Sequence, residues 1–110
     1  MSLKRLRPFL LPLFLLASNA AFAAPLKVCP PIGKVRQIHI CVGDPKDLVY
    51  LAPDDDSGNY SLGGYYEQGE FITIRCEYTD GSVRDVELRE RVEICRAADN
   101  KRHGLQTICQ

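Results

Sequence analysis

Five cysteines are the residues of this sequence best suited to covalent chemistry, and their spacing limits which chemistry is available. Redox exchange typically uses a Cys-x-x-Cys pair, because the close partner lowers the pKa of the attacking thiol. No two cysteines here are closer than Cys29 and Cys41, so the spacing argues against a thioredoxin-like role. The five are Cys29, Cys41, Cys76, Cys95 and Cys109.

A cysteine nucleophile needs a nearby base, and His39 and His103 are the two histidines available. His39 and Cys41 share one face if residues 35–42 form a strand. No signature of a cysteine hydrolase surrounds them, and the chain is too short for the two lobes of a papain-like protease. We therefore expect a protein that is not an enzyme.

Metal-binding patterns are incomplete. Zinc requires four ligands in paired short spacings, and His39-x-Cys41 is the only short pair. The aspartates at 54–56 suggest calcium, but an EF-hand loop that begins at Asp54 has Gly58 at its fifth position and Tyr65 where the bidentate glutamate belongs. We expect a solvated acidic turn here, with no metal and no cofactor.

Residues 1–23 have the three parts of a secretory signal peptide. A basic start is followed by an apolar stretch at 9–17 and by small residues at Ala21 and Ala23. Pro12 interrupts the apolar stretch, which is shorter than the roughly 20 residues that cross a bilayer. We predict cleavage after Ala23, a periplasmic or secreted product and no stable membrane insertion. A bacterial and a eukaryotic source both stay open, and only the latter would use the glycosylation sequon at Asn59.

The predicted mature chain, residues 24–110, has room for a single small domain. It carries 11 basic and 14 acidic side chains, a net charge of −3, which argues against nucleic acid as a partner. Export places its cysteines in an oxidising compartment, so we predict two disulfides. We favour Cys95 with Cys109, and Cys76 with either Cys29 or Cys41. The cysteine left over is a buried free thiol or, alternatively, links two chains into a dimer.

Alternating apolar residues predict a mainly β fold, a small antiparallel sheet or half-open barrel stapled by two disulfides. After an extended, proline-rich arm at 24–34, residues 35–42 alternate as a strand, and 71–88 alternate as a hairpin. A three-residue loop at 79–81 pairs Ile74 with Val86 and places Gly81 where a left-handed residue is needed. Residues 89–96 fit either a helix or a strand, and a second hairpin is closed by Cys95 and Cys109.

The segment from Tyr60 to Tyr66 is the candidate binding surface. We expect a short strand near Tyr60 that Gly63 and Gly64 end, followed by a loop. Tyr60, Tyr65 and Tyr66 then combine rigid amphipathic rings with an adaptable glycine-rich backbone, as recognition loops do. The alternative is that these tyrosines cap the small core.

Two resemblances rest on short motifs. Cys29-Pro30, Cys76-x-Tyr78 and the later Cys95 and Cys109 resemble a group of small exported bacterial proteins that are uncharacterised in function. Cys76-Glu77-Tyr78 and the closing Cys109 are also similar to the periplasmic lysozyme inhibitors, which implies a disulfide-tied antiparallel barrel. The inhibitory motif of that family has no match here, so the resemblance implies no site residue.

These features predict a small exported, non-catalytic protein of the inhibitor, immunity or effector type that binds another protein. The alternative is a structural or accessory periplasmic component that assembles through a sheet edge or through its unpaired cysteine.

Overall fold

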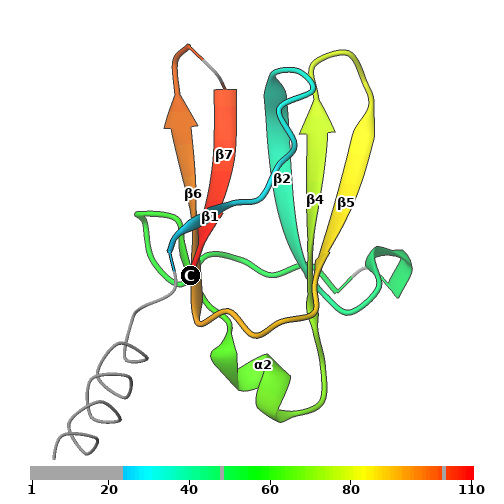
Figure 1. Cartoon of the computed structure of the whole chain (residues 1–110), viewed down its shortest axis with the longest axis vertical. Helices are drawn as coiled ribbons and strands as arrows, with labels where there is room; N and C mark the ends of the chain where they lie inside the picture. Colours follow the sequence, from blue (N-terminus) through cyan, green and yellow to red (C-terminus); the bar gives the residue numbers. More distant parts are fainter. Residues whose placement is uncertain (1–23, 48, 103) are drawn as a thin grey trace, which may run out of the picture.

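The computed structural model describes residues 24–47, 49–102 and 104–110, and the predicted signal peptide at 1–23 lies outside them. Strands dominate the described chain (Figure 1). In chain order the elements are β1 (Leu26–Lys27), β2 (Val35–Val42), the 3-10 helix η2 (Pro45–Asp47), β3 (Asn59–Ser61), α2 (Gly63–Glu67), β4 (Ile72–Tyr78), β5 (Val83–Leu88), β6 (Ile94–Asn100) and β7 (Gly104–Cys109).

The strands form one open, mixed sheet in the order β3-β6-β7-β2-β4-β5, with β1 also paired to β7. All neighbours are antiparallel except β2 and β7, which meet in parallel at a single residue pair, Val35 and Gly104. The predicted mainly β fold with two disulfides is confirmed. This parallel contact makes the sheet mixed. The arm carries the chain from the end of β7, where β1 pairs, to the start of β7, where β2 begins and runs in the same direction.

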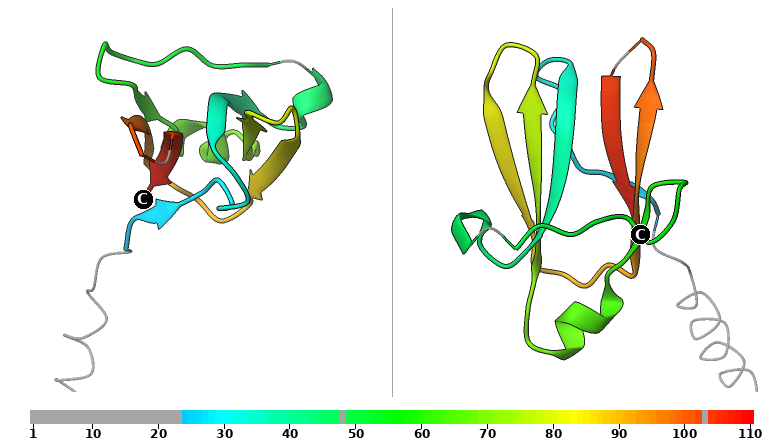
Figure 2. Two further views of the ribbon diagram at one scale, coloured as in Figure 1. Left: turned by 90° about the horizontal axis from the view of Figure 1, so that it is seen from above. Right: turned by 180° about the vertical axis from the view of Figure 1, so that it is seen from behind.

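The sheet consists of two groups of strands that stand side by side (Figure 1). β2, β4 and β5 pair along their lengths, and so do β6 and β7, whereas β2 and β7 share only one pair. Seen from above in Figure 2, residues 24–34 pass the strands on one side and residues 50–59 pass them on the other. The connecting segments therefore hold the two groups together from both sides.

The first hairpin has the predicted register. Ile72 lies opposite Leu88 and Ile74 lies opposite Val86. The Gly81 amide donates to the Tyr78 carbonyl over 2.9 Å, and Gly81 has the predicted positive φ of 91°. Only the three-residue loop keeps the apolar residues of both strands on one face, so burial of that face selects it.

The second hairpin is also confirmed, with Cys95 opposite Cys109 in a disulfide. The ambiguity over residues 89–96 is resolved in favour of a strand that begins only at Ile94, with no regular structure at 89–93. The arm is less irregular than predicted, since β1 pairs with the end of β7 and the Val28 amide donates to the Thr107 carbonyl over 2.9 Å.

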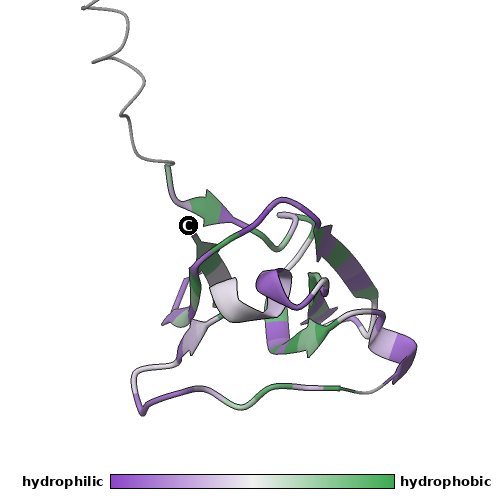
Figure 3. Cartoon of the chain, turned by 90° about the horizontal axis from the view of Figure 1, so that it is seen from below, coloured by the Kyte–Doolittle hydropathy of each residue, from purple (hydrophilic) through white to green (hydrophobic). Residues whose placement is uncertain are grey.

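The core lies on one face of β2 and β4, where Ile38, Ile40 and Val42 oppose Cys76, Ile74 and Ile72. In Figure 3 hydrophobic residues concentrate on the strands, and hydrophilic residues on many of the connecting turns. The buried core residues are Val28, Cys29, Val35, Ile40, Val42, Leu62, Ile72, Ile74, Cys76, Tyr78, Leu88, Cys95 and Cys109.

Candidate functional site

The segment from Tyr60 to Tyr66, predicted as a short strand followed by a loop, is a short strand followed by a helix. Tyr60 is on β3, while Tyr65 and Tyr66 are on α2, which Gly63 and Gly64 begin rather than prevent. The prediction of a glycine-rich loop is therefore wrong. Leu62, fully buried just before the helix, anchors its first turn and outweighs the low helix propensity of the two glycines.

All three tyrosines are half-buried and pack against the core. The Tyr66 hydroxyl donates to the Leu88 carbonyl over 2.8 Å and so ties α2 to the end of β5. Burial raises the pKa of the Tyr60 and Tyr66 hydroxyls. These contacts give the tyrosines the core-capping position that we considered as the alternative, and their role in binding stays a prediction.

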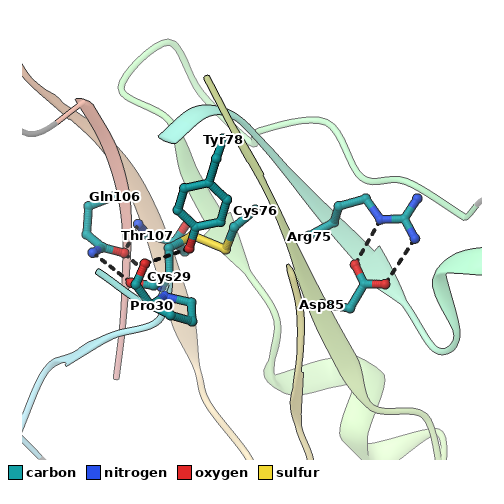
Figure 4. The surroundings of a disulfide bond; sticks show 8 residues. All are labelled: Cys29, Pro30, Arg75, Cys76, Tyr78, Asp85, Gln106 and Thr107. Atoms are coloured by element: carbon teal, nitrogen blue, oxygen red, sulfur yellow. Dashed lines mark hydrogen bonds and ion pairs between the residues drawn. A yellow bond between two sulfur atoms is a disulfide. The ribbon is translucent and has the colours of Figure 1, made fainter. Parts of the chain in front are cut away.

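The proline-rich arm is fixed to both groups of strands around Cys29 (Figure 4). Cys29 forms a disulfide with Cys76 of β4. The Gln106 side chain on β7 accepts from the Cys29 amide over 2.9 Å and donates to the Cys29 carbonyl over 3.3 Å. The Tyr78 hydroxyl donates to the Pro30 carbonyl over 2.6 Å. The arm is therefore a rigid wall whose position is set by a covalent bond and by partly buried hydrogen bonds.

A cleft of about 730 Å³ lies between this arm and the second hairpin. Its volume falls in the range of ligand pockets, about 300–1,000 Å³. The walls combine apolar groups, such as Pro31, Leu105 and Ile108, with charged groups at the rim. The lining residues are Lys27, Cys29, Pro30, Pro31, Gly33, Lys34, Val35, Ala98, Asp99, Arg102, Gly104, Leu105, Gln106 and Ile108.

A second, shallower depression of about 440 Å³ adjoins the cleft, since Lys34, Val35, Asp99, Gly104 and Leu105 line both. Its other lining residues are Arg36, Thr79 and Lys101. Together the two form a groove that crosses the join between β2 and β7. We call this combined surface the arm groove.

The opposite face of β2 and β4 carries a layer of ion pairs. Arg75 donates twice to Asp85, over 2.8 and 3.0 Å, and His39 lies 2.9 Å from a Glu77 oxygen and stacks on Tyr50. Figure 4 shows Arg75 and Asp85 on the side of the strands away from the disulfide. The hydrogen bond to Arg75 lowers the pKa of Asp85. These residues already satisfy one another, so we regard this layer as structural.

Cys41 lies beneath this layer as the free thiol, with none of its surface exposed. It pairs with Tyr50 in an isolated β-bridge, and burial raises the pKa of its thiol. The prediction that Cys76 pairs with Cys29 or Cys41 thus resolves to Cys29. The buried position also favours the free-thiol alternative over a link between chains.

We expect Cys41 to resist modification in the folded protein. At pH 8 the Cys41 thiol of native protein should react with iodoacetamide at least about tenfold more slowly than in urea, because burial disfavours the thiolate and shields it from the reagent. If the predicted export and cleavage occur, mass spectrometry should show a chain that starts at Ala24 and gains one label in urea without reductant. Labelling of three or more thiols under those conditions would contradict the disulfide assignment.

Among the described residues, no three His, Cys, Asp or Glu side chains come together as metal ligands. Within the same part of the chain, no helix is both long enough and apolar enough to span a membrane. The fold and the groove define a small, disulfide-braced, mainly β protein with a preformed surface cleft. No protein-family model, curated protein or solved structure matches this chain.

The arm groove escaped the sequence analysis because its walls come from segments about 70 residues apart, near Lys34 and Leu105. The Pro30-Pro31 pair beside a disulfide cysteine was the local signal available, since it predicts a stiff arm. A stiff arm cannot collapse onto the neighbouring hairpin, so a cleft stays open between them.

Proposed function

We propose that this protein is a small exported binding protein that acts on another protein without catalysis, and that the arm groove is its contact surface. The observation that carries the proposal is the fixation of the arm, through Cys29 to β4 and through Gln106 to β7. A wall held in place before binding does not have to be ordered by the partner. Preorganisation of this kind reduces the entropic cost of association.

The groove is better suited to an inserted segment of a partner protein than to a flat partner surface. Its apolar walls offer burial for partner side chains, and its polar lining groups offer hydrogen bonds. The alternative of an accessory component that assembles through a sheet edge has less support. The exposed edge strand β5 carries Arg84, Asp85 and Glu87, and charges on an edge disfavour strand addition.

The proposal is tested by blocking the groove. Ala98 lines the groove on β6, so Ala98→Trp should fill part of it, while Ala52→Trp adds the same side chain to an exposed loop. Tagged protein comprising residues 24–110 is used to recover partners from the extracytoplasmic fraction of the source cells, and melting temperatures are recorded. We expect Ala98→Trp to lose at least about 90% of a partner that Ala52→Trp retains, as for a blocked hot spot.

Equal recovery by both tryptophan variants would remove the groove from consideration. Loss on Tyr65→Ala, with retention by Ala98→Trp, would assign the contact to α2 instead, which carries two of the tyrosines that the sequence analysis predicted as the binding surface.

A further inference from the structure

We infer that the arm groove recognises an extended acidic segment of its protein partner, an inference that rests on the proposed function. Five cationic side chains and one acidic side chain, Asp99, line the groove among the described residues. The mature chain has the opposite balance, with 11 basic and 14 acidic side chains. The cations therefore gather at the groove although residues 24–110 carry more acidic than basic side chains. They are Lys27, Lys34, Arg36, Lys101 and Arg102.

Three of these cations lack an acidic partner in the part of the chain that the structure describes. Lys27, Lys34 and Lys101 are exposed and form no ion pair with any described residue. Arg36, which also lines the groove, pairs with Glu77, and Arg75 and Arg91 on other surfaces pair with carboxylates within 4 Å. Unpaired cations around a preformed cleft repel one another, and an anionic ligand relieves that repulsion.

The chemistry of the walls favours a peptide over other polyanions. Pro31, Leu105 and Ile108 add apolar surface to a groove that the cations also line. An acidic peptide with interspersed apolar residues can bury side chains against that surface, whereas a phosphate backbone cannot. No aromatic side chain lines the described groove, although proteins that bind single-stranded nucleic acid stack bases on aromatic rings. The net charge of −3 on the predicted mature chain, residues 24–110, also opposes long-range attraction to DNA or to an anionic membrane.

The probe for this inference is an eight-residue, fluorescein-labelled peptide, Glu-Glu-Leu-Glu-Pro-Leu-Glu-Glu, with a counterpart in which glutamine replaces every glutamate. Fluorescence anisotropy with the mature protein should give at least about tenfold tighter binding of the acidic peptide. Raising the salt concentration from 0.05 to 0.3 M should weaken that binding at least about threefold, because exposed charges are screened.

The matched variants are Lys34→Glu and Lys46→Glu. Lys34 lines both parts of the groove, whereas Lys46 lies on η2, is similarly exposed and is outside the groove. We expect Lys34→Glu to weaken binding of the acidic peptide at least about fivefold, and Lys46→Glu to change it less than about twofold. Circular dichroism verifies that both variants are folded.

Equal affinity for the two peptides, or an equal effect of the two lysine variants, would overturn the inference. Displacement of the acidic peptide by equimolar single-stranded DNA or by vesicles rich in phosphatidylglycerol would overturn it too, by assigning the groove to phosphate. Self-association of the protein in sedimentation experiments, abolished by Lys34→Glu, would assign the groove to a second copy of this chain. If partner recovery depends on Ala98 but not on salt or Lys34, the proposed function stands and only the acidic specificity fails.

Discussion

Replacing Cys29 and Cys76 together by serine is expected to lower the free energy of unfolding by about 4 kcal/mol. The two residues are 47 apart in sequence, and a crosslink across a loop of that length removes about this much conformational entropy from the unfolded chain. A domain of this size has a total stability of only about 4–13 kcal/mol. The variant should therefore unfold at much lower urea concentration than the wild type, as measured by circular dichroism.

The matched control is the double variant Cys95→Ser with Cys109→Ser. This disulfide spans 14 residues, and its loss should cost about 3 kcal/mol by the same argument. Loss of the longer crosslink should also release the arm from β4 and widen the groove, so peptide binding should weaken in that variant more than in the control. A larger destabilisation from the shorter crosslink would contradict the entropic account.

Gly104→Ala is expected to destabilise the protein by about 3 kcal/mol. Gly104 has a φ of +81°, which costs an alanine about 1–2 kcal/mol. A Cβ at this position would also lie 2.8 Å from the backbone oxygen of Val35 and 3.2 Å from its nitrogen. Since Val35 and Gly104 are the residue pair that joins β2 to β7, this contact cannot relax without separating the two groups of strands.

Gly81→Ala separates the cost of the left-handed backbone from the cost of the close approach to Val35. Gly81 has a similar φ, +91°, but no atom lies within 4 Å of the position that a Cβ would occupy. This variant should therefore lose only the left-handed backbone contribution, about 1–2 kcal/mol. Urea unfolding of both variants measures the two losses in the free energy of unfolding. Equal losses would show that the close approach of Val35 to Gly104 does not add to the cost of the substitution.

Local pattern predicted the two hairpins because each has one face that must be buried. Shifting the register of Ile74 by one residue would place the acidic Glu87 among apolar residues, so the pattern itself selects the loop at 79–81. The pairing of Cys95 with Cys109 followed from the same hairpin geometry. These features depend on residues that are close in sequence, and the sequence therefore specifies them strongly.

Tertiary contacts decided the features that the sequence analysis missed. Gly63 and Gly64 have a low helix propensity, but burial of Leu62 and the hydrogen bond from Tyr66 to Leu88 stabilise α2 from outside the helix. The choice of Cys29 over Cys41 as the partner of Cys76 likewise depends on the arm crossing the core face, while Cys41 points to the other face of β2. Neither contact is visible in a window of neighbouring residues.

The burial of Cys41 bears on how the two native disulfides form during folding. Five cysteines allow fifteen arrangements with two disulfides, and twelve of these use Cys41. Every arrangement leaves one thiol, which can attack a wrong disulfide within the same molecule and exchange it for another. Enclosure of Cys41 beneath Tyr50 is compatible only with arrangements that leave this thiol unpaired. In the native arrangement the remaining thiol is enclosed in the folded protein, where it is shielded from exchange with either disulfide.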